Sequence, residues 1–346
     1  MRTLWKIPVF ICALSLCGCA SAPEQHAGLS LEKVKHAQRV LSPVARETPV
    51  IFSDEFNGQA EVFLKLENLQ KTGAFKLRGA YYKISQLSAE QKKRGVATCS
   101  TGNHAQGVAF AAKQFGLKAT VFMPKGTAPA KVRATRDYGA QVVLVEGSFE
   151  DAVAACEKFV AQNGATYVAP YNDIDVIAGQ GTIGLEILAQ VPDVDAVVVP
   201  VGGGGLISGI AFTIKTLKPS CKVYGVQSAA VPSMLVSRER GQIATVPAGT
   251  TIADGIKVRT PGKITYALCQ QYVDGIVTVS DAQIKDAINT LLHKQKVVAE
   301  GAGAVSFAAL QSGLINIAGK RVVCVISGGN IDQGQLKELI APAQAQ

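Results

Sequence analysis

Four short segments of the sequence hold groups that could do chemistry. They are residues 72–80 around Lys76, residues 100–107, residues 202–206 and residues 327–330. Lys76 has apolar neighbours in Phe75 and Leu77. A lysine held in a desolvated pocket has a lowered pKa and can condense with an aldehyde to give a Schiff base. Taken alone, a surface lysine is the simpler interpretation of this segment.

Residues 202–205 are four consecutive glycines that follow the apolar run 196–201 and precede a predicted helix. Without Cβ atoms, successive backbone N–H groups can converge on an anion at the helix N-terminus. A phosphate monoester suits such a site. A glycine-rich turn between strand and helix also arises for steric reasons alone. The dinucleotide-binding fingerprint, which has an acidic residue about 20 positions further on, is not matched well.

Residues 100–107 combine a predicted strand end, two hydroxyl side chains, a glycine and a helix start. The N–H groups of the helix start, together with the helix dipole, predict a carboxylate-binding site. The alternative is an ordinary helix N-cap, with Ser100 or Thr101 in that role. His104, considered alone, is typical of a structural histidine.

Helices and strands are predicted to alternate around these segments. Strands are predicted at residues 61–66, 96–100, 119–123, 141–145, 196–201, 222–227 and 321–326. Helices are predicted at residues 31–41, 103–115, 131–138, 149–163, 181–190 and 206–217, and after the capping boxes at 88–91 and 280–283. This alternation predicts parallel sheets covered on both faces, with ligands at the carboxyl ends of the strands.

The N-terminus is similar to a bacterial export leader. Arg2 and Lys6 flank an apolar stretch, 7–16, that is too short to span a membrane as a stable helix. Cys19 lies in a segment that resembles a lipobox, so we expect lipidation at Cys19 and attachment on the periplasmic side. The alternatives are cleavage near residues 20–22 by an ordinary signal peptidase, or a misassigned start ahead of a cytoplasmic enzyme.

Outside the leader the chain has five cysteines at wide, irregular spacing. They predict neither a disulfide framework nor a metal site, which is unusual for an exported protein. The 346 residues are 48% hydrophobic and 18% charged, enough for two core-forming units. The net charge of +9 comes from scattered basic residues, so no nucleic-acid partner is expected. A homo-oligomer is expected.

Taken together, the four segments resemble the serine/threonine dehydratases of the fold-type II pyridoxal-phosphate (PLP) enzymes, most of all the short catabolic threonine ammonia-lyases. The resemblance extends over about residues 29–340 and includes 81–83, 176–185, 252–255 and 296–303. It implies an α/β fold similar to the tryptophan synthase β chain, with two parallel-sheet domains and PLP between them. The implied division is residues 1–28 leader and linker, 29–68 and 160–340 large domain, and 69–159 small domain.

The resemblance also implies a role for each candidate residue. Lys76 would form the Schiff base and remove the substrate α-proton, with Phe75 beside the cofactor ring. Asn103 would bind the ring oxygen, and Ser327 would face the pyridine nitrogen. The residues implied to hold the phosphate are Gly202, Gly203, Gly204, Gly205 and Leu206. The residues implied to hold the substrate carboxylate are Ser100, Thr101, Gly102 and His104.

The implied activity is dehydration of L-threonine or L-serine followed by hydrolysis, which returns the water and gives 2-oxobutyrate or pyruvate with release of ammonia. Thr101 stands where serine racemases carry a serine that acts as the second acid/base, so racemase activity stays open, as does dehydration of hydroxyaspartate. Residues 227–233 lack the acidic metal ligands of those racemases, so no metal is expected there. The rival of another class is a non-catalytic, lipid-anchored binding protein.

Overall fold

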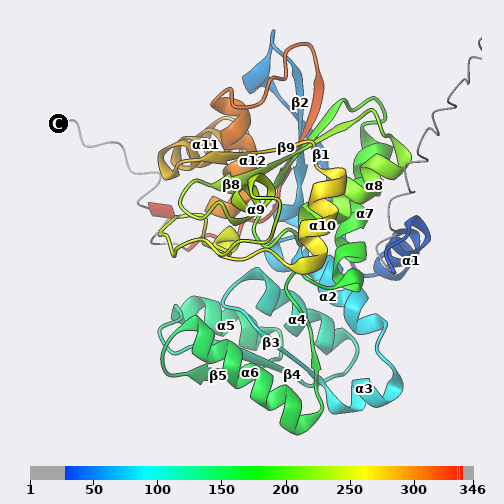
Figure 1. The fold of residues 1–346 in the computed structure, drawn as a ribbon, viewed down its shortest axis with the longest axis vertical. Coiled ribbons are helices and arrows are strands. Elements are labelled where there is room, and N and C mark those ends of the chain that lie inside the picture. The colour runs from blue at the N-terminus through cyan, green and yellow to red at the C-terminus, as the bar shows by residue number, and fades with distance from the viewer. Residues whose placement is uncertain (1–27, 333, 335, 338–346) are drawn as a thin grey trace, which may run out of the picture.

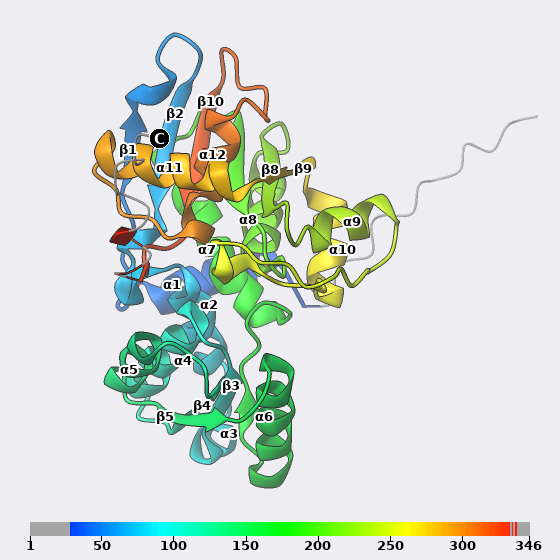
Figure 2. The same ribbon diagram turned by 90° about the vertical axis from the view of Figure 1, so that its left-hand side faces the viewer.

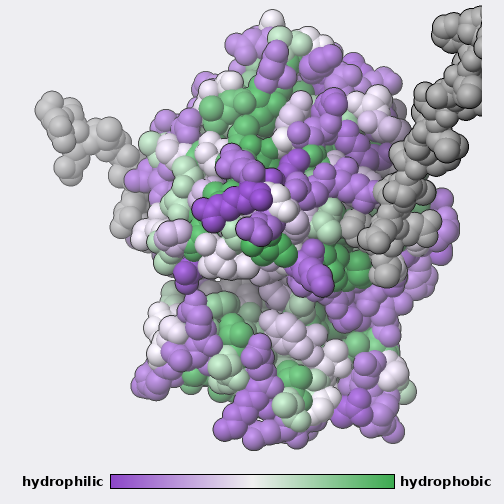
Figure 3. Space-filling view, viewed as in Figure 1, coloured by the Kyte–Doolittle hydropathy of each residue, from purple (hydrophilic) through white to green (hydrophobic). Residues whose placement is uncertain are grey.

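The computed structural model describes residues 28–332, 334, 336 and 337 of the chain. The leader and its Cys19 lie outside the described residues. The described chain forms two lobes, each built on its own β-sheet, as Figures 1 and 2 show. On the face drawn in Figure 3, a hollowed band of pale residues crosses the molecule between the lobes.

The larger lobe contains a six-stranded sheet in the order β1-β2-β10-β7-β8-β9. Its strands are β1 (Val50–Ser53), β2 (Glu61–Leu66), β7 (Ala196–Pro200), β8 (Lys222–Ser228), β9 (Gly275–Val279) and β10 (Arg321–Ile326). Every neighbouring pair is parallel except β1 and β2, which are antiparallel. The strands β1 and β9 were not predicted from the sequence.

Helices cover both faces of this sheet. Those of the larger lobe are α1 (Leu31–Leu41), α7 (Ile174–Gln190), α8 (Gly205–Leu217), α9 (Ser233–Glu239), α10 (Lys263–Tyr272), α11 (Asp281–His293) and α12 (Gly301–Gln311). The core on one face contains buried residues of α11 and α12, and the core on the other contains buried residues of α7 and α8. Both faces are apolar because a parallel sheet is buried on both sides.

The smaller lobe contains a four-stranded, fully parallel sheet in the order β5-β4-β3-β6. Its strands are β3 (Val96–Cys99), β4 (Ala119–Pro124), β5 (Gln141–Val145) and β6 (Thr166–Tyr167). The helices around it are α2 (Lys76–Ser85), α3 (Ala89–Arg94), α4 (Asn103–Gln114), α5 (Pro129–Asp137) and α6 (Phe149–Asn163). The helix α2 packs against both α4 and α7, so it joins the two lobes.

The expected boundary between the domains and the start of α7 differ most from the structure. The boundary expected between residues 159 and 160 falls inside α6, and β6 beyond it still pairs with β3. The helix α7 begins at Ile174, well before the predicted start at residue 181. Its glycines let α7 approach its neighbours closely: a Cβ atom on Gly179 would lie 2.7 Å from the backbone of α2.

The two predicted capping boxes are confirmed. Ser88 and Gln91 form a capping box at the start of α3, and Ser280 and Gln283 form another at the start of α11. The described residues also form short 3-10 turns, namely η1 (Asp54–Phe56), η2 (Glu67–Leu69), η3 (Lys71–Gly73) and η4 (Asp254–Ile256). Within the described part of the chain, no helix is both long and apolar enough to cross a membrane.

Candidate active site

The four predicted segments meet at the carboxyl ends of strands. Residues 100–102 follow β3, residues 202–204 follow β7, and Ser327 follows β10. The segment before Lys76 is attached to the end of β10, because Phe75 N–H donates to Ser327 O at 3.1 Å and Gly329 N–H donates to Gly73 O at 2.9 Å. The local backbone therefore brings the lysine segment and the Ser327 segment together, as the sequence predicts.

Lys76 begins helix α2, and its side chain is partly buried. Its Nζ donates to Pro170 O at 2.7 Å and lies 5.2 Å from the centroid of the Phe75 ring. Burial lowers the pKa of Lys76 to about 8, because desolvation disfavours the charged form. A larger fraction of this amine is therefore neutral, and nucleophilic, near neutral pH than for an exposed lysine.

The glycine loop is held in shape by its neighbours. A Cβ atom on Gly203 would lie 2.5 Å from the ring of Tyr171, and Gly204 has a φ of +96° that favours glycine. Thr265 Oγ1 donates to Gly203 O at 2.6 Å, which fixes the direction of that peptide. The helix α8 begins at Gly205, and the first N–H groups of a helix have no acceptor within it. These N–H groups are suited to an anion.

The start of α4 is free of side-chain capping. Its N-cap residue is Gly102, with no side-chain hydrogen bond, so the alternative in which Ser100 or Thr101 caps the helix is wrong. Ser100 Oγ instead accepts from Gly102 N–H at 3.3 Å. A Cβ atom on Gly102 would meet nothing within 4 Å, so open space lies beside this residue. The arrangement leaves the first N–H groups of α4 available to a carboxylate.

The ring of His104 has a structural partner. It is buried, and its Nε2 lies 2.9 Å from Val168 O, which makes that nitrogen the donor. Burial, and then the charge of Lys76, lower the pKa of His104 to about 3. The imidazole is therefore neutral at physiological pH. The group of His104 best suited to a carboxylate is its backbone N–H, in the first turn of α4.

Asn103 lies between two side chains to which the sequence analysis gave no role. Its Nδ2 donates to Glu300 Oε1 at 2.5 Å, and its Oδ1 accepts from Asn330 Nδ2 at 2.8 Å. Asn330 Nδ2 also donates to Thr72 O at 2.7 Å. These contacts fix the orientation of the Asn103 amide and leave its second N–H for a ligand. Glu300 and Asn330 stand in segments that the sequence analysis singled out, but nothing in the sequence shows that a buried acid would face Asn103.

Glu300 is an unusual carboxyl group. It is buried, and burial followed by the negative charge of Asp254 raises its pKa to about 7. The Asn103 hydrogen bond acts in the opposite direction. Ser327 is also buried, and its Oγ lies 3.5 Å from Ala302 O, a long contact that leaves this neutral hydroxyl weakly engaged.

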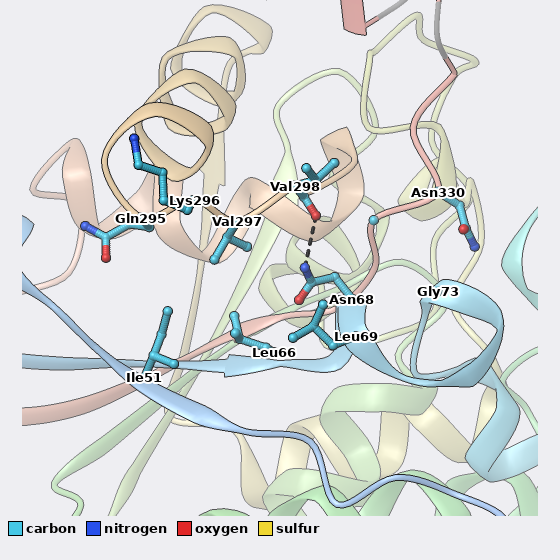
Figure 4. A pocket seen from close by; sticks show the side chains of 11 residues that line it. Ile51, Leu66, Asn68, Leu69, Gly73, Gln295, Lys296, Val297, Val298 and Asn330 are labelled. Carbon is cyan, nitrogen blue, oxygen red and sulfur yellow. Dashed lines mark hydrogen bonds between the residues drawn. The ribbon is translucent and has the colours of Figure 1, made fainter.

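A pocket of about 390 Å³ lies beside this network, on the side of Gly73 and Asn330 (Figure 4). Asn68 Nδ2 donates to Val298 O at 3.0 Å across one of its walls. Lys296, also in the wall, has a φ of +58° that side-chain-bearing residues rarely adopt. Lys76 does not line this pocket.

Metal ligands do not gather in the described residues: no group of three or more His, Cys, Asp and Glu side chains among them could hold a metal ion. In the stretch where metal ligands were considered, Gln227 Oε1 instead accepts from Leu235 N–H at 2.9 Å. The five cysteines outside the leader are free and buried, namely Cys99, Cys156, Cys221, Cys269 and Cys324.

The side chains present fit PLP. A buried lysine can hold an aldehyde, the α8 start and its glycines can hold a phosphate, and Asn103 has an amide hydrogen to offer a ring oxygen. Residues 41–328 match the model of the family described as pyridoxal-phosphate dependent enzymes. The chain belongs to this family, which confirms the predicted fold class and cofactor.

Within this family, the chain is similar to threonine ammonia-lyases. The chain is 51% identical over 315 residues to an L-threonine ammonia-lyase of Thermotoga maritima, covering 90% of this chain and 78% of the relative. It is 47% identical over 290 residues to the catabolic L-threonine dehydratase of Escherichia coli, covering 83% of this chain and 88% of the relative. The predicted resemblance to threonine ammonia-lyases is confirmed.

Solved structures of related enzymes have the same fold as this chain. Maize serine racemase matches with a TM-score of 0.86 at 34% identity, covering 90% of this chain and 96% of the other. The processed form of threonine deaminase isoform 2 from Solanum lycopersicum matches with a TM-score of 0.85 at 34% identity, covering 91% of this chain and 95% of the other. The same fold therefore occurs in a racemase and in a deaminase, and the reaction depends on the site.

Proposed function

We propose that this chain is a PLP-dependent ammonia-lyase that converts L-threonine to 2-oxobutyrate, L-serine to pyruvate, or both, with release of ammonia. The observation that carries the proposal is the buried amine of Lys76 at the junction of the two lobes, in a chain that is 51% identical to a threonine ammonia-lyase. A buried lysine of lowered pKa is suited to hold an aldehyde and to act as a base.

The proposed cofactor contacts follow the sequence-based roles. When bound, PLP supplies an electron sink for the charge that remains after the α-proton leaves. Lys76 holds the cofactor covalently, with Phe75 beside the ring, and the N–H groups of 202–206 hold the phosphate. Asn103 donates to the ring oxygen with the amide hydrogen that Glu300 leaves free. Ser327 offers the pyridine nitrogen a neutral partner.

The proposed substrate contacts lie at the start of α4. The backbone N–H of His104 and the hydroxyls of Ser100 and Thr101 hold the carboxylate, helped by the helix dipole. Gly102 N–H, which donates to Ser100 Oγ at 3.3 Å, turns to the carboxylate when substrate binds. This places the substrate against the open space beside Gly102. Lys76, freed when the substrate amine takes its place on the cofactor aldehyde, would remove the α-proton in its neutral form, and the β-hydroxyl would take up a proton and leave as water. The carboxylate site orients the substrate, and the buried lysine does the proton transfer.

Two alternative activities would use the same site. Thr101 offers a hydroxyl, and the similarity to maize serine racemase supports testing racemisation of serine. A dehydratase for hydroxyaspartate would use the same lysine with a different side-chain pocket. A non-catalytic binding protein would have no use for an amine with a lowered pKa.

The test is a keto-acid assay of purified full-length protein with L-threonine, L-serine and hydroxyaspartate. We expect 2-oxobutyrate or pyruvate, released with an equal amount of ammonia. Lys76→Ala is the control, and it should be inactive while keeping its fold. Activity with hydroxyaspartate alone, or racemisation without any keto acid, would reject the proposal.

We also propose that Cys19 is lipidated and that the mature chain is attached on the periplasmic side. Arg2, Lys6 and the apolar stretch before Cys19 support this. Membrane and soluble fractions of cells expressing the wild type and Cys19→Ala provide the test. The wild type should be found with membranes and the variant should not. An unmodified N-terminus in the cytosol would favour the alternative cytoplasmic location.

A homo-oligomer is proposed as well. Phe52, Leu69 and Val298 are large apolar side chains with 45%, 46% and 41% of their surfaces exposed. Leu69 and Val298 line the pocket of Figure 4. Light scattering coupled to size exclusion should give a mass above that of a single chain, and Leu69→Asp with Val298→Asp should reduce it.

A further inference from the structure

Four charged side chains are buried together where α2 meets the larger lobe, and none of them belongs to the site described above. They are Lys65 of β2, Glu67 of η2, Arg78 of α2 and Glu186 of α7, with exposed fractions of 0%, 0%, 1% and 8%. Two are cationic and two are anionic, so the cluster is neutral as a whole. It joins a strand of the large sheet to the two helices α2 and α7.

Arg78 uses its whole guanidinium group. Its Nε and Nη2 donate to the two carboxylate oxygens of Glu67 at 2.9 and 2.8 Å. Its Nη1 and Nη2 donate to the two oxygens of Glu186 at 2.5 and 2.9 Å. Planar forked contacts of this kind fix direction as well as distance, which a lysine cannot do. Arg78 is thus held between two carboxylates from different elements.

Lys65 completes the cluster. Its Nζ donates to Glu186 Oε2 at 2.6 Å, to Thr48 O at 2.7 Å and to Gln190 Oε1 at 2.8 Å. All three ammonium hydrogens therefore have acceptors. Burial lowers the pKa of Lys65, and the charge of Glu186 opposes that effect. Glu186 is in this way fixed to β2 as well as to α2.

The cluster lies next to the point where α2 and α7 touch through their backbones. A Cβ atom on Gly79 would lie 2.7 Å from Val176 O, and one on Gly179 would lie 2.7 Å from Arg78 O. Glycines at such a crossing allow close approach but provide no side chains that interlock. The packing at this crossing therefore leaves the rotation of α2 relative to α7 unfixed. The directional hydrogen bonds of Arg78 fix that rotation.

Net stability is a poor explanation for such a cluster. Taking charges out of water costs free energy that their mutual attraction offsets only in part, so buried ion clusters add little to stability. Their hydrogen bonds do specify geometry. Arg78 is two residues from Lys76 on the first turn of α2, so a rotation of α2 moves the lysine directly.

We propose that Arg78, held by Glu67 and Glu186, is a positioning residue for Lys76: it sets the rotation of α2 that keeps the lysine amine buried against Pro170. The inference rests on the proposed role of Lys76 as the cofactor lysine. Arg78 touches neither the substrate nor the reacting atoms and acts through the helix. If α2 is free to rotate, the amine becomes more solvated and is protonated to a greater extent at pH 7.

Two variants and one control separate positioning from folding. Arg78→Lys keeps the positive charge but loses the paired hydrogen bonds to Glu67 and to Glu186. Arg78→Leu combined with Glu67→Leu removes a matched pair and leaves Lys65 paired with Glu186, so no net charge is buried. The control is Lys83→Met, since Lys83 is also on α2 and pairs with Asp173 at 2.8 Å, but at the end distant from Lys76.

The main measurement is the rate at which PLP bonds to the cofactor-free, full-length chain as a function of pH, followed by absorbance. Only the neutral amine reacts, so the pH profile reports the protonation of Lys76. We expect both Arg78 variants to move the profile upward by about one pH unit and to slow bonding at pH 7 about tenfold. Their kcat should fall more than their KM changes, and Lys83→Met should match the wild type in profile and kcat.

An unchanged profile in both Arg78 variants overturns the proposal. An equal displacement of the pH profile in Lys83→Met also overturns it, because the effect is then not specific to Arg78. Failure of both Arg78 variants to fold while Lys83→Met folds overturns it as well, because the cluster then serves stability alone. If PLP does not bond to Lys76 in the wild type, the proposed function fails instead, and that result is distinct from all the others.

Discussion

Glu300 accepts a hydrogen bond from the side-chain amide of Asn103 at 2.5 Å, although 197 positions separate the two residues in the chain. The contact joins the larger lobe to the start of α4. The carboxyl group is buried, and its pKa is raised to about 7. The residue proposed to bind the cofactor ring oxygen is thus oriented by a group that titrates near neutral pH.

The first prediction concerns Glu300 and the stability of the cofactor-free chain. Burial raises the pKa of Glu300 from 4.5 to about 7, so the folded chain retains a proton that the unfolded chain releases in this range. The contribution of Glu300 to the free energy of unfolding is complete below pH 4.5. It is lost as the pH rises to about 7, and the loss amounts to at most about 3 kcal/mol. Glu300→Gln, which does not titrate, should remove this dependence.

The measurement is urea unfolding of both proteins between pH 4.5 and 7.5. The difference in unfolding free energy between wild type and Glu300→Gln should change across this window, in favour of the variant at higher pH. Glu146→Gln, at an exposed position in an ion pair with Lys125, is the control for replacing a carboxyl group by an amide. A constant difference for Glu300→Gln would mean that the carboxyl titrates normally.

The second prediction concerns the glycine loop. Gly203→Ala should destabilise the chain by about 1–3 kcal/mol and weaken PLP binding, because the added methyl group would lie 2.5 Å from the Tyr171 ring. Gly126→Ala is the matched control, since its Cβ would meet nothing within 4 Å. Thermal unfolding and PLP titration of both variants provide the test. Equal behaviour of the two variants would show that the loop tolerates a side chain.

Most of the fold could be predicted from the sequence because its signals are local. The capping residues Ser88 and Ser280 and the apolar run 196–201 lie next to the elements that they mark. Strand β1 could not be predicted, because a short strand at a sheet edge is specified by its pairing with β2 rather than by its own pattern. The start of α7 was missed because Gly179 weakens a helix pattern while serving close packing.

The candidate site could be predicted where a residue type carries the chemistry, as with Lys76 and the glycines of 202–205. The supporting partners could not. Glu300, Asn330 and Arg78 act through contacts between residues distant in sequence, and such contacts leave no spacing pattern. The tautomer of His104 likewise depends on Val168, whose carbonyl no motif identifies.

The third prediction concerns reaction type and Thr101. Racemisation needs a proton donor on the face of the substrate opposite Lys76, and the β-branch of threonine restricts its hydroxyl. We therefore expect L-serine to give pyruvate faster than D-serine, with both products followed in one incubation. Thr101→Ala should abolish the D-serine and spare the pyruvate if the hydroxyl is a side-activity base. If both products fall, the hydroxyl belongs to the carboxylate site. D-serine forming faster than pyruvate would contradict the lyase assignment.

The most direct test of the proposed function is reduction of the PLP-loaded protein with borohydride, followed by peptide mapping. We predict that PLP becomes fixed to Lys76, whose amine is the buried lysine group at the junction of the lobes with a pKa near 8. Lys76→Ala should take up no label and should show no turnover while it still unfolds cooperatively. A label on another lysine, or no label on the wild type, would contradict the assignment of Lys76 and the reaction built on it.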